Sequence, residues 1–226
     1  MANLFPRSSN LLAPKVIFCA GLVVTALTLG IWHYFTPKYT RVGYMPTQPV
    51  PFQHSLHVQQ LGMDCRYCHS YVEVSGHSNV PNTQTCMNCH TAIKANSPKL
   101  QPIRDSWASG KSVEWTRIHR VPDYAYFNHS AHVNRGVSCV SCHGKINEME
   151  VVWHDQPQGM AWCLACHRAP ENNLRPLAEI THLDWKPSDL GTNPQTGHPF
   201  TQLEVGSKLK ADWKVNPPVT CAGCHR

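Results

Sequence analysis

The sequence lacks the motifs by which several large enzyme classes are recognised. It has no glycine-rich phosphate loop, no Gly-x-Ser-x-Gly and no His-Glu-x-x-His, so the patterns of P-loop nucleotide hydrolases, α/β-hydrolases and zinc proteases are absent. The 226 residues carry a formal charge of +6 but no basic run with interleaved aromatic residues, which argues against a nucleic-acid partner. We expect no independent catalytic site.

Phenylalanine is also scarce, whereas proline is abundant. The chain has 6 Phe, 18 Pro and 13 Gly. Proline removes a backbone donor and interrupts both helices and sheet ladders, so long regular elements are disfavoured over most of the chain. We expect a mainly α-helical and irregular fold with short helices rather than a sheet.

One pattern stands out among the residues that are present: Cys-x-x-Cys-His occurs five times, and Cys19 alone of the 11 cysteines lies outside it. The cysteine pairs are Cys65 and Cys68, Cys86 and Cys89, Cys139 and Cys142, Cys163 and Cys166, and Cys221 and Cys224. The histidines that follow them are His69, His90, His143, His167 and His225. This pattern is the attachment signature of c-type haem. The two thiols form thioethers to the porphyrin, and the histidine is the proximal iron ligand.

Zinc sites and disulfides are the alternatives to haem. Zinc also binds Cys-x-x-Cys pairs, but it does not require a histidine after every pair, and a disulfide framework would not impose a five-fold repeat. We therefore predict five covalently attached c-type haems. At this density the haem faces must form much of the apolar interior, so the chain is expected to wrap around its cofactors. The haem propionates add negative charge that the formal value omits.

An apolar segment precedes the motifs. Residues 16–32 contain no charged side chain, and with His33, Tyr34 and Phe35 the run reaches the length that crosses a bilayer. A cleaved signal peptide is the alternative. The run is longer than a usual signal-peptide core and ends in aromatic residues typical of a membrane interface, so we favour a retained transmembrane helix. Cys19 is then an apolar filler of the span.

The segment between the apolar run and the motifs is rich in proline. Residues 37–51 contain four prolines and predict an extended linker. We thus divide the chain into an N-terminus and anchor (1–36), this linker (37–51) and a haem domain (52–226). Haem is attached outside the cytoplasm in bacteria. The haem domain is therefore expected on the periplasmic side of the inner membrane, with the N-terminus in the cytoplasm and a single pass through the lipid bilayer.

The haem domain contains an internal repeat of the form Phe-x-His-Ser-x-His. It begins at Phe52 and again at Phe127, each time before two haem motifs. This indicates two related dihaem modules, 52–90 and 127–167, followed by a fifth haem at 221–225. The repeat histidines, which are His54, His57, His129 and His132, are spaced i, i+3. They lie on one face of a helical turn, so each pair can provide distal ligands to two neighbouring haems.

The fifth distal ligand is less sharply indicated. Met160, just before the fourth motif, could ligate through its thioether, which raises the potential of a haem; a core methionine is the alternative. His119 is the runner-up. We expect His77, His154, His182 and His198 at the surface or beside propionates. Two His pairs and a methionine can close all five irons, which favours electron transfer over substrate chemistry.

Longer stretches resemble a known family. The Phe-x-His-x-x-His element is similar to that of class III multihaem cytochromes. The stretches LGMDCRYCHSYVE, PNTQTCMNCHTAIK, WTRIHRVPDYAYFNHSAHVNRGVSCVSCHG and QGMAWCLACHR resemble the pentahaem cytochrome subunit (ActA) of alternative complex III. The resemblance covers about residues 10–226, but the fifth motif resembles the family only in its position.

The resemblance implies an electron-relay subunit of a quinol:acceptor oxidoreductase. Its partners would be an iron–sulfur subunit, polytopic quinol-binding membrane subunits and a monohaem cytochrome. Electrons would pass from menaquinol to a soluble cytochrome or copper protein, or to an oxidase. The alternative is a self-contained quinol dehydrogenase of the NapC type, also anchored by one helix, which usually has four haems. A haem enzyme of the nitrite reductase kind is less favoured, because no Cys-x-x-Cys-Lys variant is present.

Overall fold

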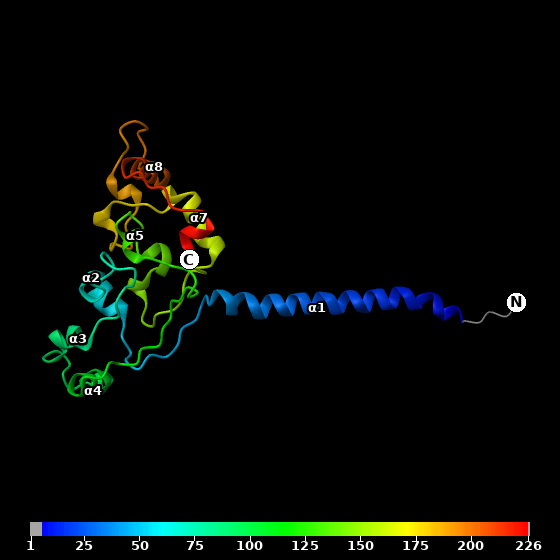
Figure 1. Cartoon of the computed structure of the whole chain (residues 1–226), viewed down its shortest axis with the longest axis horizontal. Coiled ribbons are helices and arrows are strands. Elements are labelled where there is room, and N and C mark those ends of the chain that lie inside the picture. Colours follow the sequence, from blue (N-terminus) through cyan, green and yellow to red (C-terminus); the bar gives the residue numbers. More distant parts are fainter. Residues whose placement is uncertain (1–5, 226) are drawn as a thin grey trace. The chain divides into compact units, whose positions relative to one another are not determined.

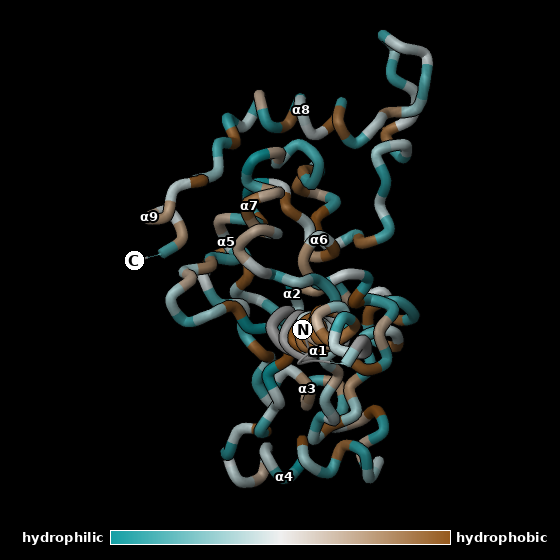
Figure 2. The backbone as a smooth tube through the Cα atoms, turned by 90° about the vertical axis from the view of Figure 1, so that its right-hand side faces the viewer, coloured by the Kyte–Doolittle hydropathy of each residue, from teal (hydrophilic) through white to brown (hydrophobic). Residues whose placement is uncertain are grey.

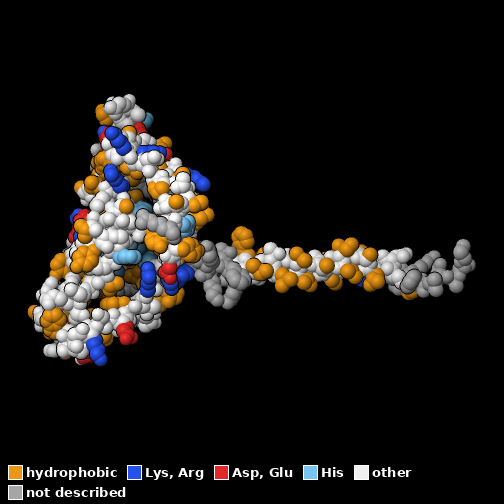
Figure 3. All heavy atoms as spheres, viewed as in Figure 1, with side chains coloured by type: hydrophobic (Ala, Val, Ile, Leu, Met, Phe, Trp, Pro, Cys, Tyr) orange, Lys and Arg blue, Asp and Glu red, His pale blue; other side chains and the backbone are white. Residues whose placement is uncertain are grey.

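The N-terminal part of the chain is almost entirely one helix. In this computed structural model, which describes residues 6–225, the short turn η1 (Arg7–Leu11) leads into α1 (Leu12–Thr40). Residues Ser9–His33 have a mean hydropathy of 2.0 over the most apolar window, and none of that window is buried in the protein. Figure 3 shows hydrophobic side chains along the visible side of this helix. The chain therefore has one N-terminal apolar helix that is long enough to cross a membrane, a property that signal sequences share.

The chain divides into two units, Met1–Val42 and Gly43–Arg226. The helix α1 continues to Thr40 and so includes the first four residues of the segment for which we expect an extended linker. From Gly43 onward, that segment belongs to the second unit. Val50 is only 4% exposed, and the Gln48 side chain pairs with the backbone of Thr116 through two hydrogen bonds of 2.8 and 2.9 Å.

The second unit is built from short helices and irregular chain, as expected. Its α-helices are α2 (Cys65–Cys68), α3 (Thr83–His90), α4 (Gln101–Ser109), α5 (His129–Val133), α6 (Val140–His143), α7 (Met160–Arg168), α8 (Gln202–Asp212) and α9 (Cys221–Cys224). Single turns complete it: η2 (Ser55–Gln60), η3 (Pro98–Leu100), η4 (Ile146–Glu148), η5 (Pro170–Asn172), η6 (Leu177–Glu179) and η7 (Pro187–Leu190). Within residues 6–225 there is no β-strand, and pairing is limited to isolated bridges such as Ala125 with His225.

Side-chain caps explain where several of these short helices begin. Asp64, Asn82 and Asn128 stand at the N-caps of α2, α3 and α5, and each accepts a hydrogen bond from a backbone N–H in the first turn. Such caps satisfy donors that an isolated turn leaves unpaired. Thr201 and Glu204 form a capping box at the start of α8. The sequence thus fixes helix starts just before the first two haem motifs and at the second repeat.

The side-chain core of the second unit is small. One buried cluster joins Val50, Met87 and Ile103. The other buried apolar side chains are Met149, Leu174, Ile180, Leu183, Trp185 and Val205. Figure 2 shows hydrophobic positions in short runs along this part of the backbone rather than in one long stretch. Because burial of apolar surface is the main favourable term in folding, so few buried side chains are consistent with cofactor faces that form much of the interior.

Candidate haem-binding sites

Each Cys-x-x-Cys-His motif lies on or beside one short helix. The motifs correspond to α2, the second half of α3, α6 with Cys139 just before it, α7, and α9 with His225 just after it. Residues three positions apart on a helix are neighbours on its surface, so the two thiols of each pair are presented together. All ten thiols are free of disulfide bonds. This donor set, two thiols followed by an imidazole, fits covalently attached haem.

Four of the five motif histidines are oriented by the same contact. The Nδ1 atom of each lies at hydrogen-bond distance from a backbone carbonyl oxygen, which can only accept, so Nδ1 carries the proton and Nε2 is left for a metal. The bonds join His69 to Asn79 (2.8 Å), His90 to Ile93 (2.9 Å), His167 to Pro218 (2.6 Å) and His225 to Tyr124 (3.0 Å). His143 differs, because its buried Nδ1 has no hydrogen-bond partner among the described residues.

The two Phe-x-His-Ser-x-His elements have the same local geometry. Phe52 meets His54 edge-on at 4.9 Å between ring centroids and stacks on His57 at 4.4 Å. Phe127 meets His129 edge-on at 4.7 Å and stacks on His132 at 4.6 Å. In both elements, the phenyl ring therefore contacts both imidazoles, the first edge-on and the second by stacking. The repeat that is visible in the sequence is a repeat in three dimensions.

The second histidine of each element faces the second haem motif of its module. The ring centroids of His57 and His90 are 6.3 Å apart, and those of His132 and His167 are 6.1 Å apart. Two imidazoles on opposite sides of one iron have centroids about 6 Å apart, since each coordination bond is about 2 Å long and each ring centroid lies about 1 Å beyond its ligating nitrogen. Both pairs fit an iron between their rings. His57 and His132 also donate Nδ1–H to a carbonyl, at 2.9 and 2.7 Å.

The first histidine of each element lies towards the first haem motif of its module. Burial, followed by the nearby imidazoles of His69 and His57, lowers the pKa of His54 to about 4. Burial and the neighbouring rings of His119 and His129, with smaller contributions from His69 and His154, lower the pKa of His143 to about 3. At neutral pH, these imidazoles are therefore neutral, which is the form that binds a metal.

The two candidates for the fifth distal ligand have different surroundings. His119 lies against His143, with ring centroids 4.3 Å apart at an angle of 84°, and 5.2 Å from the ring of His154. Met160 begins α7 and is 67% exposed. The structure thus brings His119 to the third motif.

His154 is not at the surface. We expected it at the surface or beside a propionate; its exposure of 1% shows that the first placement is wrong, and the second stays a prediction. Its backbone N–H donates to the Tyr44 carbonyl at 3.0 Å, and its carbonyl accepts from Gly43 N–H at 2.8 Å. The signal that could have found it is the apolar run Val151-Val152-Trp153 immediately before it.

Comparison with known proteins decides the family. The family model described as cytochrome c7 and related cytochrome c matches residues 50–108 and 125–226. The chain belongs to the cytochrome c7 and related cytochrome c family. It is also 31% identical over 180 residues to the menaquinone reductase multiheme cytochrome c subunit of Nitratidesulfovibrio vulgaris, covering 75% of this chain and 77% of that protein.

Two more distant relatives agree with this membership. The acrylate reductase cytochrome subunit of Shewanella woodyi is 24% identical over 93 residues, which are 41% of this chain and 62% of the relative. Cytochrome c-552 of Maridesulfovibrio salexigens is 24% identical over 196 residues, which are 66% of this chain and 39% of the relative. The chain thus spans less than two thirds of either protein. It is a multihaem cytochrome of electron transfer, with covalently bound c-type haem.

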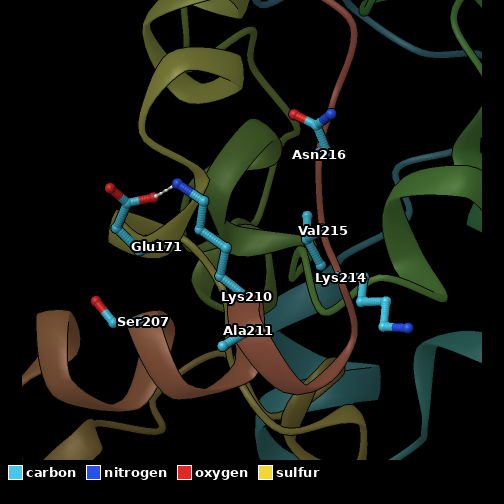
Figure 4. Close-up of a pocket in the computed structure, with 7 residues that line it drawn as sticks. All are labelled: Glu171, Ser207, Lys210, Ala211, Lys214, Val215 and Asn216. Atoms are coloured by element: carbon cyan, nitrogen blue, oxygen red, sulfur yellow. Dashed lines mark hydrogen bonds and ion pairs between the residues drawn. The ribbon is translucent and has the colours of Figure 1, made fainter.

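A surface hollow of this cytochrome is not a further haem site. It measures about 460 Å³ and lies between α8, η5 and the chain that follows α8. Its lining contains neither cysteine nor histidine, and Lys210 in it is already paired with Glu171 at 2.8 Å (Figure 4). The cysteines and histidines predicted to bind haem lie elsewhere, on or beside α2, α3, α5, α6, α7, α9 and η2.

Proposed function

We propose that this cytochrome is the membrane-anchored pentahaem relay of a quinol:acceptor oxidoreductase of the alternative complex III type. It carries electrons from menaquinol towards a periplasmic cytochrome, a copper protein or an oxidase. The observation that carries the proposal is the set of preformed imidazole pairs, His57 with His90 and His132 with His167. Iron closed on both faces transfers electrons without binding substrate. Similarity to a subunit of a menaquinone reductase supports quinone chemistry in the surrounding complex.

All five Cys-x-x-Cys-His motifs carry haem in this proposal, and every iron has two protein ligands. The pairs are His69 with His54, His90 with His57, His143 with His129, His167 with His132, and His225 with Met160, for which His119 is the alternative. The first four follow the internal repeat. The fifth pair, His225 with Met160, rests on the position of Met160 on α7. This helix also carries the cysteines of the fourth motif. The haem supplies reversible one-electron chemistry, and the protein residues attach it, orient its ligands and exclude solvent.

The proposal places α1 in the inner membrane and the haem domain on the periplasmic side. The partners are an iron–sulfur subunit, polytopic quinol-binding membrane subunits and a monohaem cytochrome. A chain from which residues 1–42 have been removed, exported by a cleavable signal, should be soluble and loaded with haem but should not oxidise menaquinol. Appreciable menaquinol oxidation by the isolated full-length chain would contradict this division of labour.

Purification from native membranes in mild detergent tests the proposal. A native gel stained for haem, followed by mass spectrometry of the stained band, should show a large assembly with an iron–sulfur subunit and polytopic membrane subunits. A band that holds this chain alone, or with one soluble reductase, would instead support a NapC-type quinol dehydrogenase. The truncated chain described above is the matched control, because it should not enter the membrane assembly.

Electron flow in the opposite direction, towards menaquinone, is a second candidate. The specific observation in its favour is the name of the 31%-identical relative, a menaquinone reductase subunit. The purified assembly distinguishes the two directions. With menaquinol added, the haem α-bands should become reduced if this chain accepts electrons from quinol. If the direction is reversed, a periplasmic donor should reduce the haems and added menaquinone should reoxidise them.

A further inference from the structure

We infer that the five haems form one line whose spatial order differs from their order in the sequence. The second haem stands at one end, followed by the first, third, fourth and fifth. The inference rests on the proposed function, because it requires a haem on every motif. It makes the first and third motifs the junction between the two modules and places the ends of the line at the second and fifth.

The junction is marked by direct contacts between the first and third motifs. The side chains of Cys65, in the first motif, and Cys139, in the third, lie next to each other. The chain after the first motif also packs against the element before the third. Backbone N–H groups of His129 and Ser130 donate to carbonyls of Gly76 and Ser75, both at 3.1 Å.

Two side chains strengthen the same junction. The His129 ring donates Nδ1–H to the Gly76 carbonyl at 3.0 Å, and Asn134 donates to the Glu73 carbonyl at 2.8 Å. The distal histidine proposed for the third haem is thus held by the segment that follows the first haem motif. The first and third haems must therefore be neighbours.

Within each module, the two motifs are adjacent. In the first module, Asn88 donates to the Tyr67 hydroxyl at 3.2 Å. In the second, Gln158, which lies just before α7, donates a side-chain hydrogen bond to the Cys142 carbonyl at 3.0 Å.

The fifth motif is attached to the fourth. The Pro218 carbonyl, three residues before Cys221, accepts the Nδ1–H of His167 at 2.6 Å. Among the described residues, no hydrogen bond joins the second motif to the third, fourth or fifth.

The exposure of the motif cysteines and the order of the helices in space agree with these contacts. Of the ten motif cysteines, all of which lie in the described part of the chain, only Cys89 and Cys221 are exposed. They belong to the second and fifth motifs, the two proposed ends. Figures 1 and 2 both show α3, α2, α5 and α7 succeeding one another in this order across the second unit.

The rate of electron transfer falls steeply as the distance between two haems increases, so the order of the haems decides which haem connects the two modules. If the haems followed the sequence order, the second haem would bridge the modules. In the inferred order the first haem is the bridge, and the second is a terminal haem at which a redox partner can dock. Loss of the first haem should isolate the second, whereas loss of the second should shorten the line without breaking it.

Proton NMR on the full-length, fully reduced and therefore diamagnetic protein in detergent micelles tests the order. Nuclear Overhauser cross-peaks between haem substituents report neighbouring haems. We expect cross-peaks between the first and second, first and third, third and fourth, and fourth and fifth haems. Cross-peaks between the second and third haems, or none between the first and third, would overturn the inference.

Two matched double variants assign the signals. Cys65→Ala with Cys68→Ala removes the first haem, and Cys86→Ala with Cys89→Ala removes the second. Should either fail to fold, His57→Met marks the second haem through the shifted methyl signal of a coordinated methionine. Intact mass spectrometry gives the haem count independently. Fewer than five haems on the wild-type chain would contradict both the proposed function and the order, whereas five haems with the wrong cross-peaks would contradict the order alone.

Discussion

The imidazole rings of His57 and His90 lie with their centroids 6.3 Å apart and their planes at 66°. Each ring is held by its own Nδ1–H, which donates to the carbonyl of Gln53 in one case and of Ile93 in the other. Phe52 stacks on the His57 ring with centroids 4.4 Å apart, and this contact fixes the tilt of the ring. The protein therefore orients both ligands by contacts that do not involve the iron, which reduces the rearrangement that accompanies ligation.

Removal of His57 should open one iron. In His57→Ala, the second haem loses its distal ligand, so one haem of the five should become high-spin while all five remain covalently attached. Electron paramagnetic resonance and the optical spectrum of the oxidised protein measure this change. The control is His198→Ala, whose side chain is exposed in a loop and which should leave the spectrum unchanged. A fully low-spin His57→Ala protein would exclude His57 as a ligand.

Close packing of α8 on η5 should make Gly206 intolerant of a side chain. A Cβ at this position would clash with the backbone carbonyl of Glu171. We expect Gly206→Ala to destabilise the protein by about 1–3 kcal/mol, because a packed interface accommodates extra volume only through backbone shifts. Thermal unfolding followed by circular dichroism in the haem bands should show a lower Tm.

Ser207→Ala is the matched control for Gly206. Ser207 is the next residue of α8 and is exposed, so its replacement should change the unfolding free energy by no more than about 0.5 kcal/mol. Equal Tm values for the two variants would show that α8 can move away from η5 without cost.

Stability at acid pH should depend on Asp64. Hydrogen bonds from Arg66, assisted by one from Thr181, lower the pKa of Asp64 from 3.8 to about 2. Since the pKa is lower in the folded state, the carboxylate stabilises the fold above about pH 4, and this contribution is lost as the pH falls towards 2. The Asp64 side chain is 41% exposed, so we expect no more than about 1 kcal/mol.

Chemical unfolding at pH 5 and pH 3 measures this contribution. Asp64→Asn should be less stable than wild type at pH 5, and the difference should shrink at pH 3. Asp123→Asn, which removes an exposed carboxylate with a side chain 82% exposed, is the control. A difference that is the same at both pH values would show that Asp64 acts as a helix cap rather than through its charge.

The sequence predicts local features of this protein well and long-range contacts poorly. The five motifs and the Phe-x-His-Ser-x-His repeat depend on residues close in the chain, so their helical turns follow from spacing and caps such as Asp64 and Asn128. The burial of Val50 could not be predicted, because it depends on packing against Met87 and Ile103, which are distant in the sequence. For His154, the apolar run before it was a signal of burial, but the backbone pairing with Gly43 and Tyr44 could not be predicted. The same holds for the Cys65–Cys139 contact, which no spacing rule contains.

The assignment of Met160 is the prediction with the sharpest alternative. Met160 is exposed at the start of α7, where a haem on the neighbouring fifth motif would cover it, whereas His119 lies 4.3 Å from His143. Methionine ligation raises a haem potential. Met160→Leu should therefore leave five haems attached but lower one midpoint potential or leave one iron five-coordinate. Potentiometric titration with optical detection gives this result directly.

His119→Gln separates the two assignments for the fifth distal ligand. If Met160 is the ligand, this variant should keep every iron low-spin, because His143 retains His129 on its opposite face in the proposed pairing. An unchanged titration of Met160→Leu, together with one high-spin haem in His119→Gln, would move the fifth distal ligand to His119. The side chain of Met160 would then serve only to cover a haem face, as thioethers often do in apolar interiors.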